Sequence, residues 1–267
     1  IRIPFPPPPA VALMITGYID AYNVFNKNEY LEIATKNAKF IADNLMSKNG
    51  KLFHNYKKGK ITINGFLEDY SATAEAFIKL YETTSNEIWL QKANDLVKYA
   101  IENFYDSKSK MFFFTSKEDA TLASKSIEIH DNVIPASNSV MAKNLFLLSH
   151  HLNNNDYKEK AALMLNNIKP QIKGNASSFS NWLDLMMNFT NNYYEVVIVG
   201  EKAKAKKTEL KQYYLPNILL SISEKESNLP LLENRFIEDE TYMYVCVNNS
   251  CKLPVTTIIE TLKLIEN

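Results

Sequence analysis

The sequence predicts a mainly α fold in which helical hairpins stack on one another and a small α/β appendage ends the chain. Apolar residues recur every three or four positions from Val11 to about Thr190, which is the spacing of one face of an α-helix. These helical segments repeat in pairs. After Asn191 the pattern changes to short apolar runs around a Lys-rich segment, as in a β–α–β unit.

The chain opens with Ile1–Ala10, in which Pro6–Pro9 are consecutive prolines. Proline has no backbone N–H and a fixed φ, so the run predicts extended polyproline II. We therefore assign residues 1–11 to a linker segment and residues 12–191 to the helical hairpins. A ligand for a proline-binding module is the alternative interpretation of the prolines.

Each predicted hairpin pairs an enclosed helix with a half-exposed one. Ala72–Leu80 and Val140–Leu148 are apolar on more than one side, which indicates helices buried on both flanks. The half-exposed helices follow polar turns and carry an aromatic residue four positions before an alanine: Tyr30, Trp89 and Tyr157. Such units stack to share a core.

The connections between the hairpins are long and strand-prone, as in Leu52–Tyr56 and Met111–Phe114. Long connections are where binding sites usually lie. Residues 192–267 form the predicted α/β unit. Its expected strands and helices are Glu195–Gly200, Lys202–Tyr214, Asn217–Ile222, Thr241–Val247 and Val255–Ile265.

The composition excludes several classes of protein. Lys+Arg and Asp+Glu are both 30, and Arg2 and Arg235 are the only arginines, which disfavours nucleic acid as a partner. The longest apolar stretches are far shorter than the ~20 residues that span a bilayer, and no signal peptide opens the chain. We expect no membrane, no cofactor, no metal and a cytoplasmic location.

Three separated segments carry specific motifs. They read NGFLEDY at Asn64–Tyr70, EIHDNVIPASNS at Glu128–Ser139 and YVCVNNSCKLPVT at Tyr244–Thr256. They resemble the D-G-F-L-x-D-Y, D-x-x-x-P-S-x-N-S and Y-V-C-x4-C-x2-P-V-T elements of the thioredoxin-domain-containing family named after spermatogenesis-associated protein twenty. Their order and spacing match across about Ala12–Leu264.

The resemblance implies an (α/α) toroid of the six-hairpin glycosidase or N-acylglucosamine 2-epimerase type, which in the family follows a thioredoxin-like domain. No C-x-x-C motif occurs here, so the resemblance implies that the N-terminal thioredoxin-like domain is a missing partner. Three hairpins form only a partial six-hairpin barrel. Because a partial ring leaves apolar faces uncovered, a homodimer or a missing N-terminal half is expected.

In such toroids, the loops that lead into the enclosed helices present polar groups to a central funnel. One loop offers Glu68, Asp69 and Tyr70, and the other offers Glu128, His130, Asp131 and Asn138. Carboxylates that face each other across a cleft can act as general acid and base. Asp69, Glu128 and Asp131 are therefore candidate catalytic residues, and the others are candidate substrate-binding residues. A structural alternative stays open, because Asp at a helix start also caps the helix.

Two more candidates lie on the connection before Asp69. His54 can shuttle protons, as epimerase chemistry at a sugar carbon requires, and Tyr56 can stack on a sugar. A packed or surface role is the alternative for His54. His150 and His151 end an enclosed helix, where positive charge is favourable.

Cys246 and Cys251 form a C-x4-C pair. A metal site needs about four ligands, and no other Cys or His lies near in the sequence. The cysteines form a possible redox pair or disulfide. The alternative is two reduced thiols that flank a turn.

Two functional hypotheses follow. In the first, the chain is a carbohydrate-binding or carbohydrate-processing module with a carboxylate-lined funnel and a sugar-like small molecule as partner, with glycosidase-like or epimerase-like activity. In the second, it is a non-catalytic scaffold that presents a client or docks the missing thioredoxin-like domain. Convergence of the carboxylates on one cavity would favour the first.

Overall fold

A computed structural model describes residues 6–119, 125–248 and 250–266 of the chain. The chain forms two compact units. Ile1–Leu145 and Glu159–Leu183 make the helical unit, and Phe146–Lys158 and Asp184–Asn267 make the second unit.

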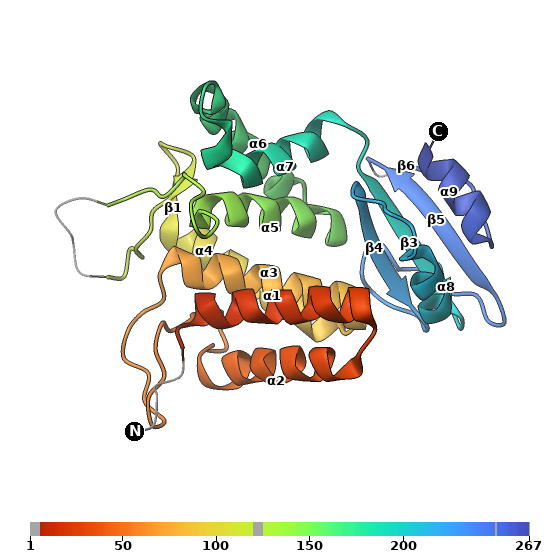
Figure 1. Cartoon of the computed structure of the whole chain (residues 1–267), viewed down its shortest axis with the longest axis horizontal. Helices are drawn as coiled ribbons and strands as arrows, with labels where there is room; N and C mark the ends of the chain where they lie inside the picture. The colour runs from red at the N-terminus through yellow and green to blue at the C-terminus, as the bar shows by residue number, and fades with distance from the viewer. Residues whose placement is uncertain (1–5, 120–124, 249, 267) are drawn as a thin grey trace. The chain divides into compact units, whose positions relative to one another are not determined.

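The helical unit is built from hairpins, as the paired pattern predicts. Helix α1 packs against α2 and α3, and α3 packs against α4 (Figure 1). The helices that contribute to this unit are α1 (Pro8–Phe25), α2 (Asn28–Asn44), α3 (Leu67–Thr84), α4 (Glu87–Phe104), α5 (Ser137–His151), α6 (Asn155–Ile172), the 3₁₀ turn η1 (Ala176–Phe179) and α7 (Ser180–Thr190).

The turns inside the hairpins explain where the helices stop. Asn26 ends α1 and Ser85 ends α3, both with left-handed backbone (φ 52° and 58°), and Asn is one of the few residues that adopt this conformation readily. The Asn86 side chain then accepts a hydrogen bond from the Ile88 N–H at the start of α4. The repeated aromatic residue packs inward, since Trp89 is buried with its ring 5.1 Å from that of Phe77.

The proline run departs from the expected polyproline II. Pro7 is extended (φ −61°, ψ 150°), but Pro8 and Pro9 form the first turn of α1 and are buried. Proline suits this position, because the N–H groups of a first turn have no partner within the helix. Residues 1–5 of the predicted linker lie outside the described residues.

The connections contain less strand than their composition suggests. Leu52 and Phe53 make isolated bridges to Met46 and Asn64. The second connection contributes β2 (Met111–Phe112), which pairs with β1 (Tyr105–Asp106).

The second unit contains a four-stranded sheet in the order β4-β3-β5-β6. Strand β3 (Tyr194–Gly200) is parallel to β4 (Ile218–Ser223) and antiparallel to β5 (Thr241–Val247), which pairs with β6 (Ser250–Cys251). Helix α8 (Ala203–Leu210) contacts β3 and β4, and α9 (Ile258–Glu266) contacts β5 (Figure 1). The predicted strands and helices are confirmed, with α8 ending before Tyr214.

All seven residues of β3 are buried, so both faces of this strand are covered. Val196 and Ile198 belong to the apolar core shared with α8 and α9. Glu195 lies on the opposite face because side chains alternate along a strand. Throughout residues 6–119, 125–248 and 250–266, no helix has both the length and the apolar character needed to cross a membrane.

Candidate functional site

The connection between α2 and α3 folds back on itself and presents His54. The His54 N–H donates to the Ile63 carbonyl at 3.0 Å, and the Asn55 side chain accepts from the N–H groups of Thr62 and Ile63. At its base, the Gly65 N–H donates to the Leu52 carbonyl at 2.9 Å. A Cβ at Gly65 would lie 2.7 Å from that carbonyl oxygen, so glycine permits this close approach.

The carboxylate of Asp69, in the first turn of α3, binds the imidazole of His54. Its Oδ2 accepts the Phe66 N–H at 2.7 Å, and its two carboxylate oxygens lie 3.0 and 3.1 Å from His54 Nδ1. Asp69 has no exposed surface. Burial raises its pKa to about 6, although the His54 charge and the Phe66 N–H act in the opposite direction.

Two glutamates lie near the His54–Asp69 pair and extend the candidate site. Burial raises the pKa of Glu68, the charge of Glu128 raises it further, and the charge of His54 lowers it. Glu128 and His54 therefore both lie within electrostatic reach of Glu68. Glu128 is fixed by the Ser137 N–H, which donates to its Oε2 at 3.0 Å at the start of α5. The structure thus brings together groups from both predicted loops.

Aromatic rings form one side of this cluster. Phe66 stacks on Phe114, with centroids 5.2 Å apart and an angle of 12° between the rings. The His54 ring packs edge-on against Phe66 at 5.0 Å. Tyr56 packs edge-on against Phe40 at 5.1 Å. The motif NGFLEDY contains Phe66, whose role in packing the histidine was not apparent from the sequence.

This arrangement is suited to proton transfer. A carboxylate bound to one imidazole nitrogen fixes the ring orientation and stabilises the imidazolium. His54 Nε2 makes no hydrogen bond within the described part of the chain, and the His54 side chain is 24% exposed. A neighbouring carboxyl with a raised pKa, Glu68, can retain a proton to donate.

Asp131 is saturated by hydrogen bonds from the protein. Its Oδ1 accepts from the Ala136 N–H, the Ser139 hydroxyl and the Asn181 amide at 3.0, 2.7 and 3.3 Å, and its Oδ2 accepts from the Asn181 N–H at 2.9 Å. These bonds tie together the starts of α5 and α7. The geometry favours a structural role for Asp131.

Three other predicted site residues lie elsewhere. Tyr70 and Asn138 are buried away from the surface, and His130 lies outside the cluster. Tyr70 is fully buried, and its hydroxyl accepts from the Leu52 N–H at 2.8 Å. The buried Asn138 amide binds both backbone groups of Phe112 and the Glu128 carbonyl, so it positions Glu128. His130 is exposed and contacts the Phe179 ring at 5.1 Å.

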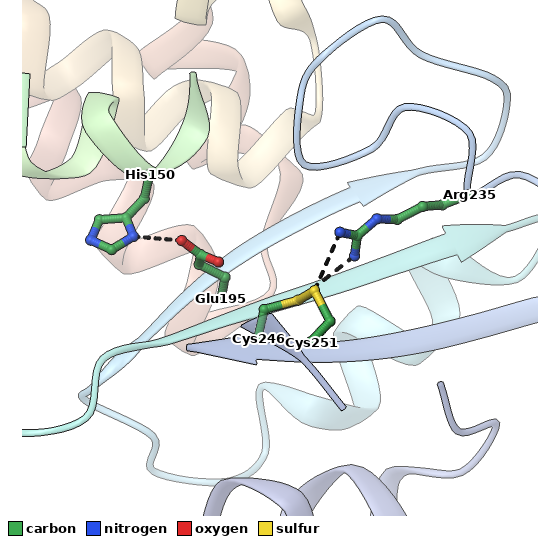
Figure 2. Close-up of a disulfide and its surroundings, with 5 residues drawn as sticks. All are labelled: His150, Glu195, Arg235, Cys246 and Cys251. Carbon is green, nitrogen blue, oxygen red and sulfur yellow. Dashed lines mark hydrogen bonds and ion pairs between the residues drawn. A yellow bond between two sulfur atoms is a disulfide. The ribbon is translucent and has the colours of Figure 1, made fainter. Parts of the chain in front are cut away.

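The second unit joins Cys246 to Cys251 in a disulfide (Figure 2). The redox activity of this pair stays a prediction. His150 and His151 lie in the last turn of α5, as expected. His150 is also buried, and its Nδ1 lies 2.7 Å from Glu195 Oε1, so a buried carboxylate is its partner. The sequence contained one signal of the His150–Glu195 pair, because Glu195 is the only charged residue in the otherwise apolar strand β3.

Other features carry no candidate chemistry. A hollow of about 560 Å³ runs along α2, away from the candidate residues, and is lined by Asn28, Leu31, Glu32, Thr35, Lys36 and Lys39. Among the residues that the structure describes, no group of three or more His, Cys, Asp or Glu side chains is placed to hold a metal ion.

Residues 11–161 match the family described as beta-L-arabinofuranosidase, GH127 catalytic domain. The chain belongs to this family. The part that matches the GH127 catalytic domain contains His54, Glu68, Asp69 and Glu128, and ends within α6.

The resemblance seen in the three motifs is also confirmed. The chain is 26% identical to spermatogenesis-associated protein 20 of Homo sapiens over 275 residues, which covers 95% of this chain and 35% of that protein. It is also 26% identical to an uncharacterized protein of Caenorhabditis elegans over 271 residues, or 93% of this chain and 36% of that protein. The chain spans about a third of the length of these curated relatives.

Among solved structures, the chain is similar to a GH76 alpha-mannanase of Bacteroides thetaiotaomicron. The TM-score is 0.57 at 16% sequence identity, and the match covers 71% of this chain and 55% of the mannanase. This likeness supports the fold and nothing finer. The predicted fold class, a helical-hairpin toroid with a small α/β appendage, is confirmed.

Proposed function

We propose that the helical unit processes a sugar by proton transfer, with His54 as the group that accepts and returns the proton. One observation carries the proposal. His54 Nδ1 is held by the buried Asp69 carboxylate, which leaves Nε2, on a partly exposed ring, without a hydrogen-bond partner among the described residues.

The carboxyl groups next to His54 have the remaining roles in the proposed reaction. Glu68 is the proton donor, since burial and the charge of Glu128 both raise its pKa. Asp69 is a positioning residue that acts through His54. The stacked rings of Phe66 and Phe114 give the site an apolar side, and sugars bind aromatic faces through their C–H groups. Membership in a glycoside hydrolase family supports a sugar as the substrate class.

Removal of Nε2 alone tests this role. In the His54→Asn variant the side-chain amide can still donate to Asp69, whereas the atom that transfers the proton is lost. We expect turnover of the substrate to fall by about 100-fold or more. His130→Asn is the matched control, because His130 is an exposed histidine of the same unit and its removal should leave the rate unchanged.

The substrates are a panel of glycosides, including a β-L-arabinofuranoside, and of free reducing sugars. NMR detects hydrolysis of the glycosides and epimerisation of the sugars in the same samples. Equal rates for wild type and His54→Asn would refute the role of His54.

The second candidate is a non-catalytic scaffold, and the structural use of Asp131 and Tyr70 favours it. Two of the predicted funnel residues hold loops in place, as a binding surface also requires. If no sugar in the panel is bound or turned over by the wild-type chain, the scaffold hypothesis replaces the enzymatic one.

A further inference from the structure

The second unit contains a small pocket that none of the proposed sugar-processing residues lines. It has a volume of about 80 Å³ and is lined in part by His150. Three aromatic side chains, Phe146, Phe189 and Tyr193, form its apolar part. The rings of Phe146 and Tyr193 lie 4.6 and 5.3 Å from the His150 ring.

His150, which lines this pocket, has an unpaired ring nitrogen. Its side chain is 6% exposed and that of Glu195 is 2% exposed. Nδ1 binds Glu195 Oε1 at 2.7 Å, while the buried Nε2 on the other side of the ring has no hydrogen-bond partner in the described structure (Figure 2). A buried polar atom without a partner is costly, so an incoming group that pairs with Nε2 would be stabilising.

The hydrogen bond to Glu195 determines which ring nitrogen is left for a ligand. Nδ1 is bound to the Glu195 carboxylate at 2.7 Å, so Nε2 is the nitrogen that an incoming group can meet. An imidazole nitrogen accepts a hydrogen bond when it is bare and donates one when it is protonated. A hydroxyl group both donates and accepts, so it can pair with Nε2 in either case.

The polar side of the pocket narrows the choice of ligand. It consists of the amides of Asn188, Asn191 and Asn248 and the ammonium of Lys158, which donates to Asn248 Oδ1 at 3.2 Å. The Lys158 charge repels an ammonium ligand. Amides both donate and accept, which matches hydroxyl groups. We propose that this pocket binds a small neutral polyol, with one hydroxyl forming a hydrogen bond with His150 Nε2 and a second meeting the asparagine amides.

The disulfide connects this site to the rest of the sheet. Cys246 and Cys251 are register partners across β5 and β6, and Asn248 lies in the turn that they enclose, with a left-handed backbone (φ 49°). On the other side, Cys246 is the register partner of Glu195. The disulfide thus holds Asn248 close to the strand that orients His150, and reduction should weaken polyol binding.

The test uses the whole chain with ¹⁵N-labelled histidine, of which there are four, titrated with glycerol and with erythritol. We expect the His150 Nε2 resonance to shift as it forms a hydrogen bond with the polyol, while the His54 resonance stays in place. In His150→Asn the amide keeps a donor for Glu195 and removes Nε2, so affinity should fall by about five-fold to ten-fold.

Two further variants keep the result interpretable if His150→Asn does not fold. Asn248→Ala changes an exposed turn residue and should weaken binding about three-fold or more, the loss of one hydrogen bond. His54→Asn should bind the polyol as wild type does, which separates this pocket from the proposed sugar-processing site.

Three results would overturn the proposal. One is the absence of any shift at His150 with either polyol, which means that water alone occupies the pocket. Another is unchanged affinity in both His150→Asn and Asn248→Ala. The third is binding of acetate with no binding of the polyols, because the pocket would then select an anion and not a neutral hydroxyl compound.

Discussion

Replacing Asp69 with Asn tests the electrostatics of the proposed site most directly. Asp69 is fully buried, accepts the Phe66 N–H and binds His54. The amide of the Asp69→Asn variant has nearly the same shape and can still accept the Phe66 N–H. It cannot ionise, however, so the comparison isolates the free energy of the buried negative charge.

The magnitude follows from the shift in the pKa of Asp69. Burial raises it from 3.8 to about 6, and each pKa unit corresponds to about 1.4 kcal/mol. Because the folded pKa is the higher one, the associated stability is present below the unfolded value and is lost as the pH rises through the folded value. Between about pH 4 and about pH 8, wild type should lose about 2–3 kcal/mol relative to Asp69→Asn.

The assay is urea unfolding of both proteins across this pH range, followed by circular dichroism. Titrating groups away from Asp69 are common to both chains and cancel in the difference, whereas the pairing with His54 is lost in Asp69→Asn and is part of what the comparison measures. Asp20→Asn is the control, since Asp20 makes an exposed ion pair with Lys79 that should contribute little at any pH. If wild type gains stability over Asp69→Asn as the pH rises, pairing with His54 outweighs burial and the reasoning is refuted.

Three other substitutions have definite expectations. Gly65→Ala places a Cβ 2.7 Å from the Leu52 carbonyl oxygen and should destabilise the chain by about 1–3 kcal/mol in urea unfolding. Replacing both Cys246 and Cys251 by Ser opens a loop of sequence separation 5 and should cost about 2 kcal/mol by chain entropy, whereas two titratable thiols in the native protein would contradict the disulfide. Glu195→Ala leaves the His150 Nδ1 unpaired and should lower the free energy of unfolding by about 1–3 kcal/mol. An unchanged urea midpoint for Glu195→Ala would show that water replaces the carboxylate as the partner of His150 Nδ1.

Local pattern was sufficient to predict the hairpins. The repeated aromatic before an alanine marks the start of each half-exposed helix, and Trp89 occupies that buried position in α4. The apolar run of β3 likewise predicts a strand that is covered on both faces. The prolines were misjudged because Pro8 and Pro9 are compatible with either polyproline II or a first helical turn, and the following residues decide between them.

The sequence alone could not assign the roles of the carboxylates. Asp69 lies in the first turn of α3 and Asp131 lies in the loop before α5. One meets a histidine and the other meets four donors. The partner of Asp131, Asn181, is 50 residues away in the chain. Since a carboxylate is made catalytic or structural by its neighbours, residue type and spacing alone left both alternatives open.

Each unit contains one histidine whose Nδ1 is bound to a buried carboxylate, and exposure separates their roles. The His54 side chain is 24% exposed and that of His150 is 6% exposed. A substrate arriving from solvent can reach His54 Nε2, whereas His150 Nε2 can meet only a group that enters its pocket. Substitutions at His54 should therefore change the rate of substrate turnover. Changes at His150 should act on ligand-dependent stability, because a ligand that binds only the folded state stabilises it in proportion to its affinity.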